Sequence, residues 1–93
     1  AAEALRLGLV NRVVADDGVR EETANLARRL ADGPPATLAA IKEGVYRGVD
    51  SSLPETLSYE YKTQRHLFLA ADAREGMQAF LEKRPAKYGN RDE

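Results

Sequence analysis

The sequence predicts a mainly helical chain of about five helices, with one short strand near the N-terminal end. Apolar side chains recur at spacings of three and four over most of the 93 residues, which is the periodicity of amphipathic helices. Proline and glycine fall between these segments, where helices begin and end. Only the run 9–14 is β-branched and bounded by turn residues, so it is the single predicted strand.

The first third of the chain contains two predicted helices on either side of this strand. Residues 1–7 are strong helix formers, and Gly8 stands where a left-handed C-terminal cap belongs. The strand Leu9–Val14 follows and ends at a turn cluster. The second helix is predicted over residues 19–31, because acidic residues occupy its first turn and arginines its last, which suits the helix dipole.

Two longer helices are predicted next. Pro35 suits the first turn of a helix that ends near Gly48, because its missing N–H has no partner to lose there. Ser52 and Glu55 are spaced as a capping box, and they open a long helix that reaches about residue 71.

Asp72 and Glu75 repeat the capping-box spacing, so a last helix is predicted to begin there after a kink and to end before Pro85. A second apolar face is possible on the long helix, off its main stripe. The stripes predicted to face a core are Val19, Thr23, Leu26, Ala27 and Leu30; Leu38, Ile41, Val45 and Val49; and Leu53, Leu57, Tyr61, Gln64, Phe68 and Ala71.

The lone strand indicates that the chain depends on something else. A strand needs a neighbour to pair its backbone donors and acceptors, and no later segment has strand character. The pairing partner is therefore expected on another segment or chain, as in a piece of a larger protein.

Composition excludes several classes of function. Fourteen basic and fifteen acidic residues are interspersed and give a net charge of −1, so no overall field is expected to hold nucleic acid or an anionic membrane. Cysteine is absent, which removes disulfides and thiolate chemistry and favours a cytoplasmic location. No apolar run approaches the roughly 20 residues that span a bilayer. We expect a soluble protein without a membrane partner.

Few residues suggest chemistry by themselves. His66 is the only histidine, so we expect no metal site, and its nearest carboxylates on the same helix are poorly placed to orient it as a base. The seven glycines stand singly, which excludes phosphate loops and dinucleotide fingerprints. We expect no catalytic residue in this chain.

The C-terminal region offers one candidate ligand site. Lys83, Arg84 and Lys87 lie beside the aromatics Phe80 and Tyr88. Cations next to an aromatic face suit a ligand that carries both phosphate and a flat heterocycle. A solvated helix end would have the same sequence, so this pattern alone leaves both interpretations open.

A family resemblance favours the ligand site. Two sequence blocks, residues 3–14 and residues 72–84, resemble in order and spacing the end of the spiral core and the C-terminal helices of the enoyl-CoA hydratase/isomerase (crotonase) superfamily. Several residues between these blocks fit the same pattern. The residues that carry the resemblance are Glu3, Ala4, Leu5, Gly8, Leu9, Val10, Asn11, Val13 and Val14; Pro34, Pro35, Ala36, Lys42, Leu57 and Glu60; and Asp72, Glu75, Gly76, Met77, Ala79, Phe80, Leu81, Glu82, Lys83 and Arg84.

The resemblance implies the rest of the prediction. Residues 1–14 would be the tail of a crotonase-like α/β spiral, and residues 15–93 a C-terminal helical region for oligomerisation and coenzyme A contact. Phe80 and Lys83 would bind coenzyme A, often across the subunits of a trimer. Tyr88 stands where phenylalanine is usual, and Gly89 comes one position early, so the tail departs from the family pattern. No cofactor would be bound permanently, because the acyl-CoA thioester is the substrate.

Two functions remain open at this point. In the first, the chain is the C-terminal part of an enzyme that hydrates 2-enoyl-CoA or moves its double bond, with partners in the missing N-terminal core and in a homotrimer or hexamer. The family's oxyanion hole and paired glutamates belong to the spiral core, which would precede residue 1, so this chain alone would be catalytically silent. In the second, it is a helical interaction module without catalysis.

Overall fold

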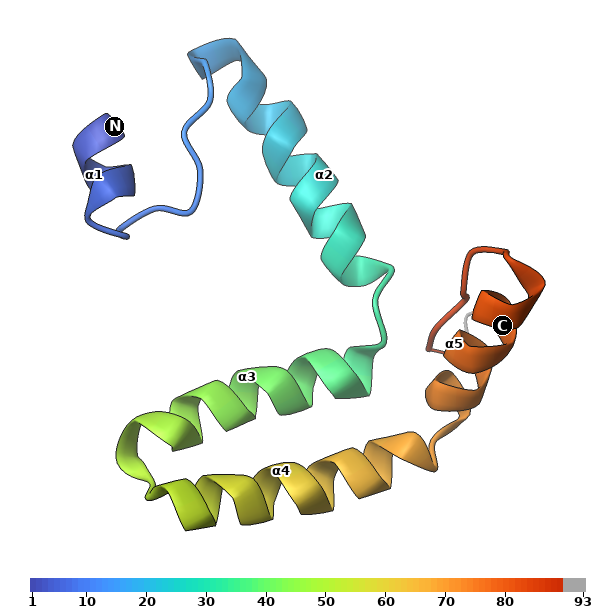
Figure 1. The fold of residues 1–93 in the computed structure, drawn as a ribbon. Coiled ribbons are helices and arrows are strands. Elements are labelled where there is room, and N and C mark those ends of the chain that lie inside the picture. Colours follow the sequence, from blue (N-terminus) through green and yellow to red (C-terminus); the bar gives the residue numbers. More distant parts are fainter. Residues whose placement is uncertain (90–93) are drawn as a thin grey trace. The chain divides into compact units, whose positions relative to one another are not determined.

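A computed structural model of the chain describes residues 1–89 and confirms the mainly helical architecture. Within that range there are five α-helices and one short 3-10 turn at Asp16–Gly18 (Figure 1). The chain divides into two compact units, Ala1–Leu30 and Ala31–Glu93. The helices are α1 (Ala2–Arg6), α2 (Val19–Ala31), α3 (Pro35–Asp50), α4 (Leu53–Phe68) and α5 (Ala71–Glu82).

The first unit corrects the predicted strand. Residues 9–14 form no strand and run as an irregular, exposed connection between α1 and the 3-10 turn, with Arg12 ion-paired to Glu22 of α2. A strand is stable only when its backbone groups pair with a neighbour, and residues 1–89 contain no such neighbour. The predicted cap of α1 is confirmed: Gly8 has a φ of +73°, and its N–H donates to the carbonyl of Leu5.

In the second unit, α3 and α4 form an antiparallel hairpin (Figure 1). The turn between them ends in the predicted capping box, where the N–H and the hydroxyl of Ser52 both donate to Glu55, at 2.9 and 2.6 Å. The two helices meet at Tyr59, whose hydroxyl reaches the carbonyl oxygen of Ala40 at 3.4 Å. The guanidinium of Arg47 lies 4.9 Å from the centre of the Tyr59 ring, within range of a cation–π interaction.

Helix α4 ends at Phe68, and α5 starts after a sharp change of direction, as predicted. The capping residue differs from the prediction, because Ala70 is the N-cap of α5 and Asp72 already lies within the helix. The Asp72 carboxylate therefore does not cap its own helix. It accepts a hydrogen bond of 2.9 Å from the backbone N–H of Gly89 instead.

The apolar stripes predicted to be buried are largely uncovered. Among residues 1–89, Ala79 alone is buried. Helix α4 packs against α3 on the side that includes Tyr59, which lies off the predicted stripe. The stripe itself, from Leu53 to Phe68, remains exposed to solvent. The most exposed members of the predicted stripes are Val49 at 78%, Leu53 at 71%, Tyr61 at 68%, Val45 at 66% and Phe68 at 64%.

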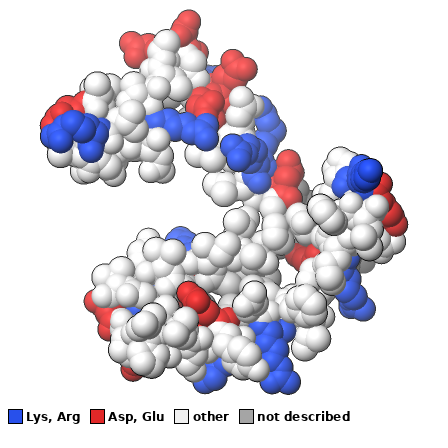
Figure 2. All heavy atoms as spheres, in the orientation of Figure 1, with Lys and Arg blue, Asp and Glu red and all other residues white. Residues whose placement is uncertain are grey.

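The surface charges are mixed in sign, as the composition predicts. On the face drawn in Figure 2, basic and acidic side chains are interspersed, and uncharged atoms cover much of the α3–α4 hairpin. Within residues 1–89, no helix combines the length and the apolar character needed to cross a membrane.

Candidate functional site

The candidate site is built on the C-terminal end of α5. The N–H of Lys83 donates to the carbonyl of Phe80, and the N–H of Arg84 donates to the carbonyl of Ala79 at 3.0 Å. These two bonds form a Schellman motif, in which the residue after the helix adopts the left-handed conformation. That residue is Lys83, with φ +53° and ψ +40°, and it is the one non-glycine residue with positive φ in the described chain.

A lysine in this position is unusual because its Cβ meets the following backbone carbonyl, which costs roughly 1–2 kcal/mol relative to the right-handed conformation. The same motif ends α1, where the left-handed residue is Gly8. The chain therefore places glycine at one such turn and lysine at the other. Other contacts must stabilise the second turn.

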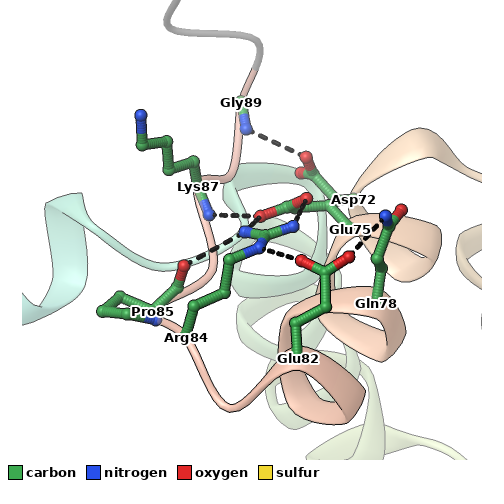
Figure 3. A network of polar contacts seen from close by, with 8 residues as sticks. All are labelled: Asp72, Glu75, Gln78, Glu82, Arg84, Pro85, Lys87 and Gly89. Carbon is green, nitrogen blue, oxygen red and sulfur yellow. Dashed lines mark hydrogen bonds and ion pairs between the residues drawn. The ribbon is translucent and has the colours of Figure 1, made fainter.

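Those contacts come from Glu75, about two helical turns before the end of α5 (Figure 3). Both of its carboxylate oxygens accept hydrogen bonds from the Arg84 guanidinium, at 2.7 and 3.0 Å. One oxygen also accepts the backbone N–H of Lys87 at 2.8 Å. Glu82 supplies a second acceptor for Arg84 and is itself held by Gln78.

The electrostatics of this cluster favour its charged form. Hydrogen bonds from Arg84 first, and then from the Lys87 backbone, lower the pKa of Glu75 to about 2. The pKa of Glu82 is lowered by its bonds to Arg84 and Gln78, and the pKa of Arg84 is raised mainly by Glu75. All three groups are therefore ionised at neutral pH, and the guanidinium is already neutralised by carboxylates.

The segment after the helix folds back along α5. Tyr88 lies over Gly76, and a Cβ built at position 76 would come 3.1 Å from the Tyr88 hydroxyl. Gly89, with a φ of +78°, donates its N–H to Asp72. Together with the Glu75 contacts, these interactions fix residues 84–89 against one face of the helix.

The two predicted coenzyme A residues are accessible. Phe80 is 83% exposed and lines a hollow of about 870 Å³ between α3, α4, α5 and Tyr88. Lys83 is exposed and has no ion pair within residues 1–89. Arg84, grouped with Lys83 in the sequence, is engaged by Glu75, whereas the Lys87 ammonium points away from the cluster (Figure 3).

Sequence reasoning assigned Glu75 to a helix cap and so missed its part in the fold-back. The available signal was the nine-residue interval between Glu75 and Arg84, which spans the end of the helix, together with a glycine at position 76 inside it. His66 is exposed on α4. Residues 1–89 contain no group of three or more side chains that could together bind a metal ion.

Comparison with known proteins now identifies the family. The enoyl-CoA hydratase/isomerase family matches residues 1–91. The chain belongs to that family. It is 42% identical over 91 residues to a probable enoyl-CoA hydratase of Rhodobacter capsulatus, and the matched region covers 98% of this chain and 35% of the relative. It is also 41% identical over 90 residues to a carnitinyl-CoA dehydratase of Salmonella typhi, with 90% and 34% covered.

Solved structures of the enoyl-CoA hydratase/isomerase family share the fold. A crystal structure of an enoyl-CoA hydratase from Polaromonas sp. JS666 superposes with a TM-score of 0.89 at 30% identity, over 96% of this chain and 35% of that one. The chain thus spans about a third of the length of the relatives that it matches. The family acts on coenzyme A thioesters.

Proposed function

We propose that the chain is the C-terminal part of an enzyme that hydrates 2-enoyl-CoA or moves its double bond, and that it supplies subunit contacts and part of the coenzyme A site. In this proposal residues 1–14 belong to the end of the spiral core, and residues 15–93 form the helical region. The reacting groups reside in the portion of the relatives that this chain does not match.

The family match over residues 1–91 carries this proposal, and the uncovered apolar faces support its subunit contacts. Leaving a large apolar side chain in water forgoes about 1.5–3 kcal/mol of stabilisation per residue, and contiguous exposed patches mark interaction surfaces. Val45, Val49, Leu53 and Phe68 are all more than 60% exposed. Such faces suit contacts with the spiral core and with neighbouring subunits of a homotrimer or hexamer.

Phe80 and Lys83 are proposed to contact coenzyme A. The exposed Phe80 ring offers an apolar wall at the edge of the hollow, where the pantetheine arm or adenine can pack. The Lys83 ammonium, without a carboxylate partner in the described chain, is free to meet a phosphate. Arg84 is a poor candidate because two carboxylates already satisfy its guanidinium.

The first test is a hydration assay with crotonyl-CoA. The 93-residue chain alone is expected to give no turnover above the uncatalysed rate. A chimera in which this chain replaces the matching third of the Rhodobacter capsulatus relative is expected to be active, with that unmodified relative as reference. Turnover by the isolated chain would overturn the assignment of the reacting groups to the unmatched portion.

The second test concerns the binding residues in the same chimera. Lys83→Ala is expected to raise KM about three- to fivefold with little change in kcat, because an exposed charge contact contributes up to about 1 kcal/mol. Lys62→Ala, at an exposed lysine on α4 outside the residues that carry the family resemblance, is the matched control. An unchanged KM in Lys83→Ala removes this lysine from the site.

A catalytically silent interaction module is the second candidate, because the same exposed faces suit docking to an unrelated protein. The chimera separates the two. An active chimera supports the enzyme, whereas a chimera that folds but neither binds coenzyme A nor turns over crotonyl-CoA favours the module.

A further inference from the structure

The turn that carries Lys83 is flanked by the ion pair between Arg84 and Glu75. Lys83 adopts a left-handed conformation, which is unfavourable for any residue that has a Cβ. The following residue, Arg84, donates two hydrogen bonds to Glu75. A Schellman motif commonly has an apolar contact between the residue after the turn and the last part of the helix. In this chain the residue after the turn is Arg84, and it forms an ion pair with Glu75 instead of an apolar contact.

Glu75 also fixes the far side of the turn. Its carboxylate accepts the N–H of Lys87, four residues beyond Lys83, so one side chain holds the segment after the turn at two points, the Arg84 guanidinium and the Lys87 backbone. The Glu75 side chain is 24% exposed and that of Arg84 36%, which makes this pair less solvent-screened than the Arg6–Glu3 and Arg47–Glu43 pairs. Glu75 thus adds side-chain contacts on the far side of a turn that the backbone bonds from Lys83 and Arg84 close.

We infer that Glu75 is a positioning residue: through Arg84 and the Lys87 backbone it keeps Lys83 in the left-handed turn and so presets the lysine for the phosphate of coenzyme A. This inference rests on the proposed function, because it assumes that Lys83 meets the ligand. Without the Glu75 carboxylate, residue 83 is free to leave the left-handed region. Apparent affinity then falls in proportion to the fraction of molecules that keep the turn.

The conformational half of this inference is tested on the 93-residue chain itself. Backbone chemical shifts and the strong intraresidue NOE between HN and Hα of residue 83 report its left-handed conformation. In Glu75→Gln they are expected to move toward averaged values, while those of Gly8, which has the same motif but no contact with Glu75, stay unchanged. Left-handed values that persist at residue 83 in Glu75→Gln overturn the inference.

The binding half uses the chimera described above, with coenzyme A as the probe in a calorimetric titration. Glu75→Gln is expected to weaken binding about three- to fivefold, and to weaken it no further when Lys83 is already alanine, because both changes then remove one contact. Arg84→Lys keeps the charge but loses the two-bond fork, and is expected to show a smaller loss in the same direction. This milder variant covers the case in which Glu75→Gln does not fold.

The outcomes separate the two proposals. Weaker binding in Lys83→Ala with normal binding in Glu75→Gln leaves the coenzyme A contact standing and overturns the positioning role. An equal loss from Glu75→Gln in the presence and absence of Lys83 also overturns it, since Glu75 would then act on something else. Normal binding in Lys83→Ala overturns the proposed contact and, with it, this inference.

Discussion

The Tyr88 hydroxyl lies so close to Gly76 that a side chain at position 76 would press against it. A Cβ there would be 3.1 Å from the hydroxyl oxygen but 3.5 and 3.7 Å from the nearest ring carbons, which are ordinary contact distances. The close approach is therefore confined to one atom. Glycine within α5 allows the segment after the helix to fold back along it.

Gly76→Ala consequently has two opposing effects on stability. Alanine favours the helix by about 1 kcal/mol over glycine, whereas its methyl group displaces the Tyr88 hydroxyl. We expect Tyr88→Phe to be more favourable in the Gly76→Ala background than in the original chain, by about 0.5 kcal/mol or more. Urea unfolding of the four variants measures this coupling, and purely additive effects would contradict the contact.

Two glycines of α3 form a matched pair for a second prediction. A Cβ at Gly48 would meet nothing within 4 Å, whereas one at Gly44 would lie 3.3 Å from the Tyr59 ring. Gly48→Ala is expected to stabilise the chain by about 0.5–1 kcal/mol through helix propensity alone. Gly44→Ala is expected to gain less, because the Tyr59 ring must shift. Thermal unfolding followed by circular dichroism compares them, and an equal gain at both sites would show that the hairpin is looser at Tyr59.

The fold-back should loosen in acid. The pKa of Glu75 is lowered from 4.5 to about 2, so its ion pair contributes stability that is complete above about pH 4.5 and is lost as pH falls toward 2. Between those values the unfolded state binds the proton that the folded state excludes. We expect the Tyr88 and Lys87 resonances to shift over this interval.

Glu75→Gln is the control for this acid transition. The variant has no titrating group at position 75, so the part of the transition that belongs to Glu75 should disappear. A transition of the same size in Glu75→Gln would assign it to another carboxylate, such as Glu82, which shares Arg84 with Glu75, or Asp72, which accepts the N–H of Gly89.

The capping box of α4 gives a prediction independent of the site. Ser52→Ala removes the hydroxyl that donates to Glu55 and is expected to destabilise the helix by about 1 kcal/mol. Ser51→Ala, one residue earlier and outside the box, is the control and is expected to be nearly neutral. Helix content at several temperatures measures both, and equal losses would mean that the box contributes nothing beyond the loss of a serine.

The fold was predictable where local interactions decide it. The bounds 19–31 follow from charges that match the helix dipole, and Ser52 with Glu55 marked the start of α4. The segment Leu9–Val14 was predicted wrongly, because β-branched residues favour a strand but form one only where a second strand is present to pair with them. The stripes on α3 and α4 were recognisable as apolar, but periodicity does not tell what covers them.

The site was predictable in part. Lys83 and Phe80 were identified through resemblance, and their roles stay predictions. The role of Glu75 was not foreseen, because its spacing from Asp72 is that of a capping box, while its partners lie nine and twelve residues later, beyond the end of the helix. Contacts across a chain reversal leave no short-range periodicity to detect.

The burial of Ala79 alone among residues 1–89 has a consequence for the life of the polypeptide in a cell. Helices that share almost no interior melt one by one, so the free chain should unfold over a broad temperature range and be cut readily by proteases. Chaperones bind exposed apolar faces of this kind, and a chain that lacks the polypeptide covering them becomes a target for degradation. The cellular abundance of this chain would then follow the abundance of that covering polypeptide.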